Sequence, residues 1–351
     1  MSMALTPNER EQQLTLWTAQ TLKASPESIQ LKPIASDAGF RRYFRFNTPS
    51  QWLAVDAPPQ TEDSRQFVAL ARYLSEHQVH TPGILAADET LGFLLVEDFG
   101  DELLHRQLSP ATAAHCYRQT FASLLGLQAC PDKPALIPRY DRALLRRELE
   151  IFSEWFAGKL LGYQLNEIDY TLLNDLFLKL EDITLKQPQT LVHRDFHSRN
   201  LIVRPGHSLG VIDFQGALWG SCTYDLVSLL RDCYIRWPAE LVKGLALEYR
   251  QAAIDANLLG DAVSEAQYLR WFDWTGLQRH IKVLGIFARL NLRDNKPHYL
   301  KDLPLVIRYI LEVANTYPEL KPFADWFRTH LLPLAKRQAW YSDYHHAGDI
   351  Q

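Results

Sequence analysis

The segment TLVHRDFHSRNLIV, residues 190–203, places an acid between two histidines and an asparagine five positions after that acid. Apolar residues typical of β-strands flank this polar run on both sides, so the pattern predicts a strand, a polar loop and a second strand. Another strand-like run, LGVIDFQGALWG at residues 209–220, contains a carboxylate at Asp213. A hairpin between the two runs would return Asp213 to the edge that carries the loop.

Asp195, Asn200 and Asp213 are oxygen-bearing residues that follow one another at short intervals. Phosphoryl transfer from a nucleotide needs a carboxylate to orient the attacking hydroxyl. It also needs a carboxylate and an amide oxygen to hold Mg²⁺ against the phosphates. We therefore expect Asp195 to be the catalytic base and Asn200 and Asp213 to bind Mg²⁺. The alternative for each is an ordinary loop residue that caps a turn.

The composition describes an ordinary globular protein. The chain has 351 residues, of which 47% are hydrophobic and 22% charged, so it can bury a large core and form two lobes. The net charge of −4 gives no basic footprint for nucleic acid. No apolar run approaches the roughly 18 residues of a membrane span. We therefore expect neither nucleic-acid nor membrane binding.

The cysteines and the N-terminus favour a cytoplasmic protein. The four cysteines form no CxxC pair, which is typical of reduced, buried thiols. The first residues, MSMALTPNEREQQ, lack the apolar segment of a secretory signal. A zinc site built from His193, Asp195 and His197 is disfavoured because no fourth ligand motif accompanies them.

The N-terminal part of the chain alternates between helical and strand patterns. A capping box at residues 6–9 predicts a helix that runs to about residue 23. Short β-like runs between residues 30 and 56, and again at 81–98, indicate a small meander of strands. The spacing of apolar residues at 61–77 between them is helical.

After EDFGD, residues 97–101, most of the chain has helical patterns. One helix is expected to carry an apolar stripe from Leu145 to Phe156, and a long helix is expected at 264–292. The sequence therefore predicts an α+β protein with a small antiparallel-sheet lobe, 1–97, and a mostly helical lobe, 98–351. The polar C-terminal segment YSDYHHAGDIQ is expected to be loosely held.

The central motifs resemble a known superfamily. His193-Arg194-Asp195 with Asn200, followed by Ile212-Asp213-Phe214, resembles the catalytic loop and metal-binding strand of the aminoglycoside phosphotransferase and choline kinase superfamily, relatives of protein kinases. Residues 224–232 resemble the helix that follows in that superfamily. The resemblance covers nearly the whole chain and implies a bilobal, protein-kinase-like fold that uses ATP and Mg²⁺.

A protein kinase is disfavoured by the context of these motifs. The chain has no GxGxxG, Gln215 stands where protein kinases have the glycine of their DFG motif, and only ten residues separate Gln215 from Asp225. That interval is too short for an activation segment and a peptide platform. A small-molecule kinase is favoured.

Four further stretches resemble the bacterial anomeric kinases of N-acetylmuramate and N-acetylglucosamine in peptidoglycan recycling. They are SDAGFRRYFRF at 36–46, VDAPP at 55–59, LLVEDFGD at 94–101 and GLQRHIKVLGIFARL at 276–290. The resemblance implies ATP-dependent phosphorylation of the C1 hydroxyl to the α-1-phosphate, which a sugar-1-phosphate nucleotidyltransferase would then use. We expect a cytoplasmic monomer or weak dimer.

Two alternatives stay open. The first is a kinase of another hydroxyl compound, such as an amino alcohol or an aminoglycoside. Such cationic substrates call for carboxylates or an aromatic cage, and Trp271, Asp273 and Trp274 could supply them. The second is an inactive nucleotide-binding pseudokinase.

The resemblance also assigns the nucleotide side. It implies a phosphate-covering turn at 36–42, with binding residues Ser36, Gly39, Phe40 and Arg42, although the residues alone favour an ordinary hairpin turn. The interlobe link with Glu97 and Phe99 would offer backbone groups to adenine.

Kinases of this kind usually carry a lysine on the third strand, and Val55-Asp56 stand there instead. Arg42 or Arg45 could supply the missing charge, but strand alternation puts them on opposite faces.

The substrate side is inferred from charge on the long helix. At about 100° per residue, five polar residues fall on one arc, and Arg279 and Lys282 are expected to reach the cleft while the others stay in solvent. The five are Gln278, Arg279, Lys282, Arg289 and Arg293. Such a face suits the lactyl carboxylate of N-acetylmuramate better than a cationic aminoglycoside.

Three further residues are weighed for the sugar site. Glu148 could hydrogen-bond to the sugar, and His197 is either a sugar contact or a residue that packs the loop. Trp155 could stack on the sugar, although a core position is favoured. His193 is expected to support the loop backbone.

Overall fold

The computed structural model describes residues 6–34, 40–47, 50–204, 206 and 209–349. By its internal contacts the chain divides into two compact units. The first contains Met1–Arg106 and Arg199–Gln215, and the second contains Gln107–Ser198 and Gly216–Gln351. The lobe boundary expected near residue 97 stays a prediction; the units differ from it chiefly because residues 199–215 return to the first unit.

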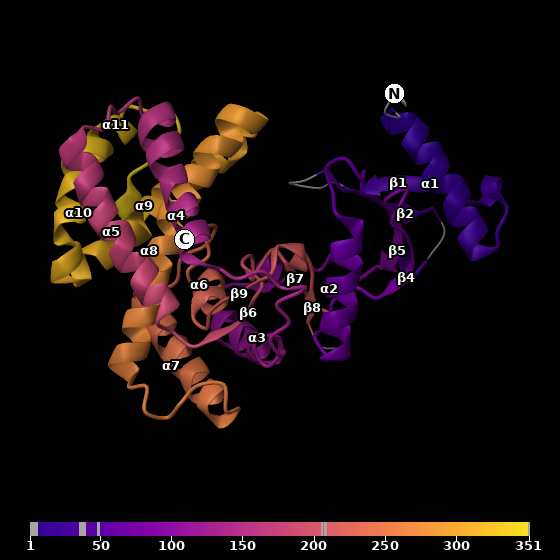
Figure 1. Cartoon of the computed structure of the whole chain (residues 1–351), viewed down its shortest axis with the longest axis horizontal. Coiled ribbons are helices and arrows are strands. Elements are labelled where there is room, and N and C mark those ends of the chain that lie inside the picture. Colours follow the sequence, from indigo (N-terminus) through magenta and orange to yellow (C-terminus); the bar gives the residue numbers. More distant parts are fainter. Residues whose placement is uncertain (1–5, 35–39, 48–49, 205, 207–208, 350–351) are drawn as a thin grey trace. The chain divides into compact units, whose positions relative to one another are not determined.

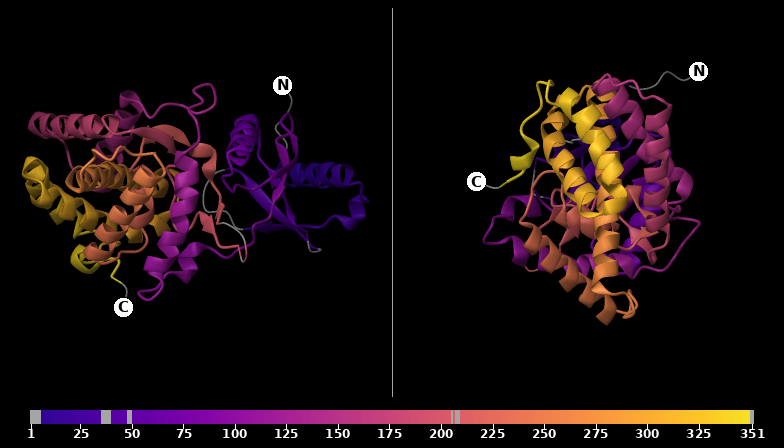
Figure 2. Two further views of the ribbon diagram at one scale, coloured as in Figure 1. Left: turned by 90° about the horizontal axis from the view of Figure 1, so that it is seen from below. Right: turned by 90° about the vertical axis from the view of Figure 1, so that its left-hand side faces the viewer.

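The first unit is built on a five-stranded antiparallel sheet with the order β1-β2-β3-β5-β4. Figures 1 and 2 show this sheet between helices α1 and α2. The strands are β1 (Leu31–Ile34), β2 (Arg42–Phe46), β3 (Trp52–Asp56), β4 (Ile84–Asp88) and β5 (Phe93–Glu97), and the helices are α1 (Pro7–Leu22) and α2 (Ser64–Glu76). The predicted small antiparallel sheet is confirmed.

Helix α1 begins as the sequence predicted. The Glu9 amide donates to the Thr6 hydroxyl, and the Thr6 amide donates to the Glu9 carboxylate, so both halves of the capping box are present. The helix packs its buried Leu14 against Phe44 and Phe93 of the sheet. Since side chains alternate along a strand, the side chains of Arg41 and Tyr43 lie on the other face of the sheet from Phe44.

A two-stranded hairpin, β7 (Leu201–Ile202) with β8 (Gly210–Val211), completes the first unit. Its backbone bonds to that unit, because the Val203 amide donates to the Glu102 carbonyl at 2.7 Å and the Val211 amide donates to the His80 carbonyl at 2.8 Å. The Phe99 ring lies where a Cβ on Gly210 would stand, so only glycine allows this approach. This hairpin carries Asn200 and Asp213 at its two ends.

The second unit is mostly helical, as predicted, around the long helix α8 (Glu265–Asp294). Its other elements are α3 (Ala113–Gln128), α4 (Arg142–Ile151), the π-helix η3 (Phe152–Leu160), α5 (Glu167–Leu185), β6 (Gln189–Val192), β9 (Leu218–Ser221), α6 (Tyr224–Leu230), α7 (Ala239–Asp255), α9 (Leu303–Thr316), α10 (Lys321–Trp326), the π-helix η7 (Phe327–Leu331) and α11 (Leu332–Ala335). Strands β6 and β9 pair antiparallel. Figure 2 shows the helices of this unit from two further directions.

Short 3₁₀ helices connect many of these elements. They are Pro26–Ser28, Leu104–Gln107, Phe214–Gly216, Pro297–Asp302, Pro318–Leu320 and Tyr344–His346. The apolar stripe from Leu145 to Phe156 is buried as expected. It lies on two helical forms rather than one, because the α-helix ends at Ile151 and continues as the π-helix. The junction lies against Gly285 of α8.

Replacement of Gly285 by alanine is expected to destabilise the second unit. A Cβ there would lie 2.5 Å from the carbonyl carbon of Ile151 and 2.6 Å from the Phe152 nitrogen, and these backbone atoms cannot move aside cheaply. Overpacking of this kind costs about 1–3 kcal/mol, which outweighs the gain of up to about 1 kcal/mol in helix propensity. Urea unfolding of G285A measures the loss. G244A on the exposed side of α7, where a Cβ meets nothing within 4 Å, is the matched control and should be neutral or stabilising.

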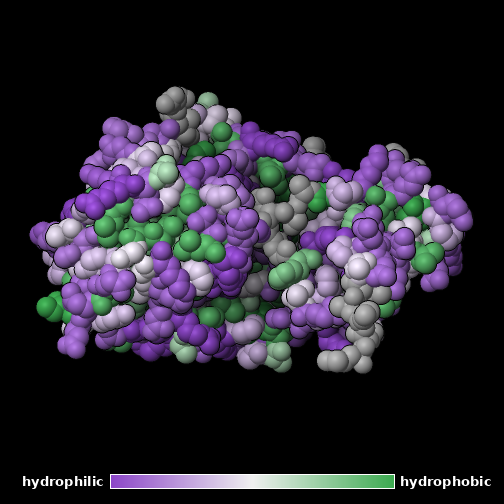
Figure 3. Space-filling model, turned by 90° about the horizontal axis from the view of Figure 1, so that it is seen from above, coloured by the Kyte–Doolittle hydropathy of each residue, from purple (hydrophilic) through white to green (hydrophobic). Residues whose placement is uncertain are grey.

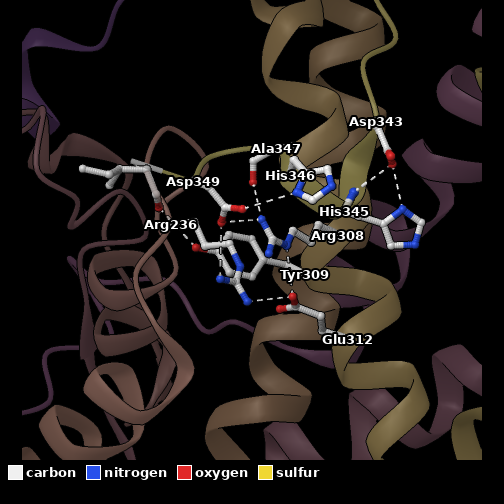
Figure 4. Close-up of polar contacts among 10 residues, drawn as sticks. Arg236, Arg308, Tyr309, Glu312, Asp343, His345, His346, Ala347 and Asp349 are labelled. Atoms are coloured by element: carbon white, nitrogen blue, oxygen red, sulfur yellow. Dashed lines mark hydrogen bonds and ion pairs between the residues drawn. The ribbon is translucent and has the colours of Figure 1, made fainter. Parts of the chain in front are cut away.

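The expectation of a loosely held C-terminal segment is wrong for the residues that the structure describes. The Asp349 carboxylate accepts from Arg308 of α9 at 2.7 Å and lies 3.7 Å from Arg236, and the Arg236 amide donates to the Gly348 carbonyl at 3.2 Å. Figure 4 shows these contacts. The segment is polar, but Asp349 has arginine partners that lie far away in the sequence.

The surface drawn in Figure 3 is largely hydrophilic, with hydrophobic residues in small groups between the polar ones. Among the described helices, none combines the length and the hydrophobicity that crossing a membrane requires.

Candidate active site

The catalytic loop leaves β6 and is held by a buried carboxylate from α6. Asp225 accepts hydrogen bonds from the amides of His193 at 2.6 Å and Arg194 at 2.9 Å. Arg194 adopts a left-handed backbone with φ of 77°, which is costly for a residue with a Cβ and is typical of functional sites. The Asp195 amide donates to the His193 ring at 3.3 Å. His193 therefore supports the loop backbone, as the sequence indicated.

The end of the loop is fixed by a second buried acid. The Ser198 hydroxyl donates to Asp232 at 2.7 Å, and the Tyr234 amide donates to the other oxygen of Asp232 at 3.1 Å. Asp232 thus ties the catalytic loop to the segment after α6.

Asp195 opens into a pocket of the second unit. Two cations, Arg279 and Lys282, lie on the same wall, which α8 forms together with apolar side chains. The lining residues are Asp195, His197, Tyr224, Cys233, Tyr234, Arg279, Lys282, Val283, Ile286 and Phe287. His197 packs edge-on against Tyr234, with ring centroids 5.7 Å apart. The pocket joins a carboxylate, two cations and an apolar surface.

The pKa of Asp195 is lowered from its ordinary value. Its side chain remains accessible to solvent, but the surrounding protein atoms desolvate it and raise the pKa. Lys282, His197, Arg279 and Arg194 together lower the pKa by more than burial raises it. Asp195 is therefore ionised at neutral pH and can accept a hydrogen bond from a hydroxyl group.

Glu148 is buried and does not line the pocket. Its carboxylate accepts from the Tyr140 hydroxyl and the Arg194 guanidinium, and it lies 3.1 Å from the Lys282 ammonium. Burial raises the pKa of Glu148, but Lys282 and Arg194 lower it by a larger amount, so Glu148 stays charged. This arrangement holds Lys282 against the pocket. It favours a positioning role over the sugar contact expected from the sequence.

The remaining polar residues of the α8 arc have other surroundings. Gln278 is buried and donates to the Tyr140 hydroxyl at 3.2 Å. Arg293 is exposed and pairs with Asp294 at 2.7 Å, and Arg289 is half-buried. Trp155 packs against the core and stacks with the Lys159 ammonium at 3.6 Å. Of the arc, only Arg279 and Lys282 lie among the lining residues.

Two of the residues that could have bound a cationic substrate, Asp273 and Trp274, make other contacts. Asp273 accepts from Arg231 and from the Tyr317 hydroxyl, each at 2.6 Å, and Arg270 covers the Trp274 ring at 4.4 Å from its centroid. None of Trp271, Asp273 and Trp274 is among the described residues that line the pocket. The cage expected from these three residues is therefore not formed in the described part of this pocket.

Several pocket residues were not predicted as site residues. Tyr224, Cys233 and Tyr234 come from α6 and the segment after it, and Ile286 and Phe287 extend the α8 wall by one turn. Their helical spacing from Arg279 and Lys282 was a usable signal for the α8 residues. Nothing local marked Cys233 or Tyr234, which reach the pocket through the Asp232 contacts.

Asn200 and Asp213 lie together in the first unit. The Asn200 carbonyl accepts from the Ile212 amide at 3.1 Å, so the two ends of the hairpin are adjacent. Asp213 is exposed with a left-handed φ of 64°, and Gln215 donates to it at 2.6 Å. Carboxylate and amide oxygens, the types that Asp213 and Asn200 supply at the two ends of this hairpin, are ligands that Mg²⁺ prefers. Within the described part of the chain, no group of three His, Cys, Asp or Glu side chains could hold a metal.

The predicted nucleotide residues fall in the first unit, and two of them, Ser36 and Gly39, lie outside the described residues. Phe40 is exposed, and its amide donates to Glu62 at 3.1 Å. Phe99 lies under the Arg204 guanidinium, 4.1 Å from its ring centroid, and Arg204 also pairs with Glu97 at 2.8 Å. The side chains of Glu97 and Phe99 thus pack on the hairpin segment.

Neither arginine proposed to replace the strand lysine is available. Arg42 donates to Asp56 at 2.6 Å and to the Pro7 carbonyl at 2.8 Å. Arg45 donates to Asp98 at 2.6 Å and also pairs with Asp101. Strand alternation does put the two on opposite faces, but each already has acidic partners.

Lowering the pH through about 6 is expected to reduce kcat. Burial raises the pKa of Asp225 to about 6, above its ordinary value of 3.8, so its carboxylate takes up a proton in this range. The protonated group accepts the amides of His193 and Arg194 more weakly, and the catalytic loop loosens. The pH profile of kcat measures this, with D225N as the comparison. An acidic limb that D225N leaves unchanged would contradict the assignment.

Protonation of Asp225 should lower kcat but raise the free energy of unfolding. Because the folded pKa exceeds the unfolded one, the folded state binds the proton more tightly. The stability contribution of Asp225 is therefore fully present below about pH 4 and is lost as the pH rises through 6, with a total of about 3 kcal/mol. Urea unfolding should show a loss of about 1.3 kcal/mol between pH 5 and pH 7 in the wild type, and no such loss in D225N.

One unit is an antiparallel sheet with a carboxylate and an amide on a hairpin, and the other is helical with a charged carboxylate in a pocket. This combination defines a protein-kinase-like phosphotransferase. Comparison with known proteins agrees with this class. The sequence profile of the phosphotransferase enzyme family matches residues 30–258, and the chain belongs to this family.

Relatives match over most of their length. The Pseudomonas putida protein named N-acetylmuramate/N-acetylglucosamine kinase is 39% identical over 326 residues, which cover 90% of this chain and 95% of that protein. A protein of the same name from Neisseria meningitidis is 39% identical over 297 residues, or 82% of this chain and 86% of that protein.

Solved structures agree on the fold. The ethanolamine kinase of Plasmodium vivax has a TM-score of 0.63 at 12% identity, with 92% of this chain and 93% of that chain covered. The ADP-bound aminoglycoside phosphotransferase APH(2'')-Ib has a TM-score of 0.59 at 14% identity and covers 86% of this chain and 98% of its own. The predicted protein-kinase-like fold is confirmed.

Proposed function

We propose that this protein is an ATP-dependent kinase that phosphorylates the C1 hydroxyl of N-acetylmuramate and N-acetylglucosamine. The observation that carries the proposal is the pocket of the second unit, where Asp195 stands beside Arg279 and Lys282. Relatives that are 37–39% identical over most of the chain have the name of this activity.

The pocket suits an acidic or neutral sugar. Arg279 is buried, and its guanidinium donates one hydrogen bond to the Cys233 sulfur at 3.3 Å, so it keeps donors for a carboxylate or for hydroxyl groups. The apolar side chains of Val283, Ile286 and Phe287 offer a surface for the sugar ring and the N-acetyl methyl group. An amino alcohol or an aminoglycoside would meet two positive charges here, which disfavours cationic substrates.

Asp195 would act on the acceptor hydroxyl. The ionised carboxylate accepts the hydrogen bond of the C1 hydroxyl, and as the C1 oxygen bonds to the γ-phosphorus, the bond from that phosphorus to the bridging oxygen of ADP breaks. The hydroxyl proton passes to Asp195 at the end of the step. Lys282 and Arg279 orient the sugar, and Glu148 holds Lys282 in place.

Asn200 and Asp213 would hold Mg²⁺. When bound, the ion would neutralise phosphate charge on the nucleotide. The exposed Asp213 carboxylate and the neighbouring Asn200 amide have the oxygen ligands that this ion prefers. The left-handed backbone at Asp213 supports a functional position for this side chain.

The setting of the reaction is also a proposal. We place the enzyme in the cytoplasm, where ATP is available and where its four buried cysteines would stay reduced. A sugar-1-phosphate nucleotidyltransferase would consume the product. We expect a monomer or weak dimer that needs no nucleic acid and no membrane.

An acceptor panel tests the proposal. ADP formation with Mg-ATP should be stimulated by N-acetylmuramate and N-acetylglucosamine, and not by choline, ethanolamine or kanamycin. Stimulation by a cationic acceptor alone would overturn the proposal in favour of the alternative kinase. Binding of Mg-ATP without turnover on any acceptor would identify a pseudokinase.

A further inference from the structure

Arg41 is a buried cation that the proposed mechanism has not yet used. It directly precedes β2, is 6% exposed, and has its guanidinium carbon 4.6 Å from the centroid of the Phe67 ring of α2. Its Nη2 lies 3.1 Å from the Glu62 carboxylate. One acid thus balances the charge of Arg41, whereas the neighbouring Arg42 contacts two.

Two of the three guanidinium nitrogens of Arg41 lack a partner. Nε and Nη1 are buried and make no hydrogen bond in the described part of the protein. Buried donors without an acceptor are destabilising, and charged donors more so, and native proteins therefore rarely leave them without a partner. An acceptor that the protein chain itself does not supply is indicated, and two donors on one planar group fit an oxyanion.

Glu62 holds both Arg41 and the residue before it. One oxygen of Glu62 accepts the Phe40 amide at 3.1 Å, and the other pairs with Arg41. Glu62 precedes Asp63, whose side chain caps α2 by accepting from the Gln66 amide at 2.9 Å. The end of the expected phosphate-covering turn is therefore anchored to the beginning of a helix.

Arg41 lies on the side of the sheet that carries Asp213. Alternation puts Arg41 and Tyr43 on one face, and Tyr43 pairs across the strands with Val55, which stands where a strand lysine is expected. Burial raises the pKa of the Tyr43 hydroxyl, Arg41 lowers it and Asp213 raises it, so both charged groups act electrostatically on Tyr43. Phe214, next to Asp213, stacks on Phe67 at 4.9 Å between centroids.

We propose that Arg41 binds the phosphate oxygens of the nucleotide in place of the absent strand lysine, and that Glu62 is the residue that positions it. The inference rests on the proposed kinase function. The positive charge has moved from β3 to the start of the neighbouring strand. Arg41 keeps one ion pair with Glu62 and uses Nε and Nη1 for phosphate.

Nucleotide binding by calorimetry tests the proposal. R41Q should bind ADP in the presence of Mg²⁺ about 10- to 100-fold more weakly than the wild type, because charge-assisted hydrogen bonds are lost. KM for ATP should rise, whereas KM for the sugar should stay within twofold. R41K, which keeps the charge, should recover part of the affinity. R65A removes an arginine that is 81% exposed in the same unit and should change nothing.

The outcomes separate this inference from the proposed function. Nucleotide affinity of R41Q within twofold of the wild type would overturn it. If R41Q lost sugar affinity as much as nucleotide affinity, Arg41 would have a structural role, and the inference would be overturned. The same conclusion would follow if R41Q and R41K were both unfolded. If the wild type phosphorylates no sugar but R41Q still loses ADP affinity, the proposed sugar kinase fails while the role of Arg41 stands.

Discussion

Replacement of Asp195 by asparagine is expected to lower kcat by about 10³-fold while leaving the fold and the nucleotide affinity intact. The asparagine has the same shape, but it cannot accept the proton of the acceptor hydroxyl. In the wild type, Lys282, His197 and Arg279 keep the carboxylate charged. The measurement is steady-state kcat with the sugar that the wild type prefers, together with calorimetric ADP binding.

D325N is the matched control for this variant. Asp325 is an exposed carboxylate of the same unit that pairs with Lys321 at 2.7 Å and with Arg328 at 3.5 Å. It should retain full activity, because surface ion pairs contribute little. If D195N kept more than a tenth of the wild-type kcat, Asp195 would not be the base.

Replacement of Asp213 by asparagine is expected to reduce kcat/KM for ATP by about 10²-fold or more. Loss of groups that merely support a metal ligand typically costs 10- to 100-fold, and Asp213 is the proposed ligand itself. The variant should also require a higher Mg²⁺ concentration for half-maximal activity, because one of the two protein ligands has lost its charge. Titration of activity with Mg²⁺ measures both effects.

Exposed Glu76 at the end of α2 offers a control in the same unit. E76Q should titrate with Mg²⁺ like the wild type. An unchanged Mg²⁺ requirement in D213N would remove Asp213 from the metal site, and the acidic metal ligand would have to be sought elsewhere.

The local elements of the fold were predictable because their signals are local. The Thr6–Glu9 capping box, the long α8 helix and the hairpin after Asn200 are each encoded within a short stretch. The return of residues 199–215 to the first unit was not predictable, since it depends on backbone bonds to His80 and Glu102 far away in the sequence. The C-terminal segment shows the same limit through Arg308.

The candidate site divides in the same way. Asp195, Arg279 and Lys282, which line one pocket, were predictable because the catalytic motif and the polar arc of α8 are local signals. Glu148 looked like a sugar ligand because its buried partners, Arg194 and Lys282, are distant in the sequence and give no local signal. Charge alone does not distinguish a binding residue from a counter-ion.

Arg41, Arg42 and Arg45 around β2 show most clearly that charge alone does not identify a binding residue. In RRYFR their order predicts alternation between the faces of the sheet, and Arg42 and Arg45 were the candidates for the missing cation. The acids that neutralise them, Asp56 and Asp98, are contributed by other strands and loops. Arg41 could not be chosen without the structure, because only the structure shows its unpartnered nitrogens.

The most direct test of the account is the loss of reducing ends from N-acetylmuramate and N-acetylglucosamine in the presence of Mg-ATP. Phosphorylation at C1 blocks the reducing end, whereas transfer to any other hydroxyl leaves it free. Reducing ends should disappear in step with ADP formation for the wild type and persist with D195N. Reducing ends that persist with the wild type while ADP forms would contradict the anomeric kinase.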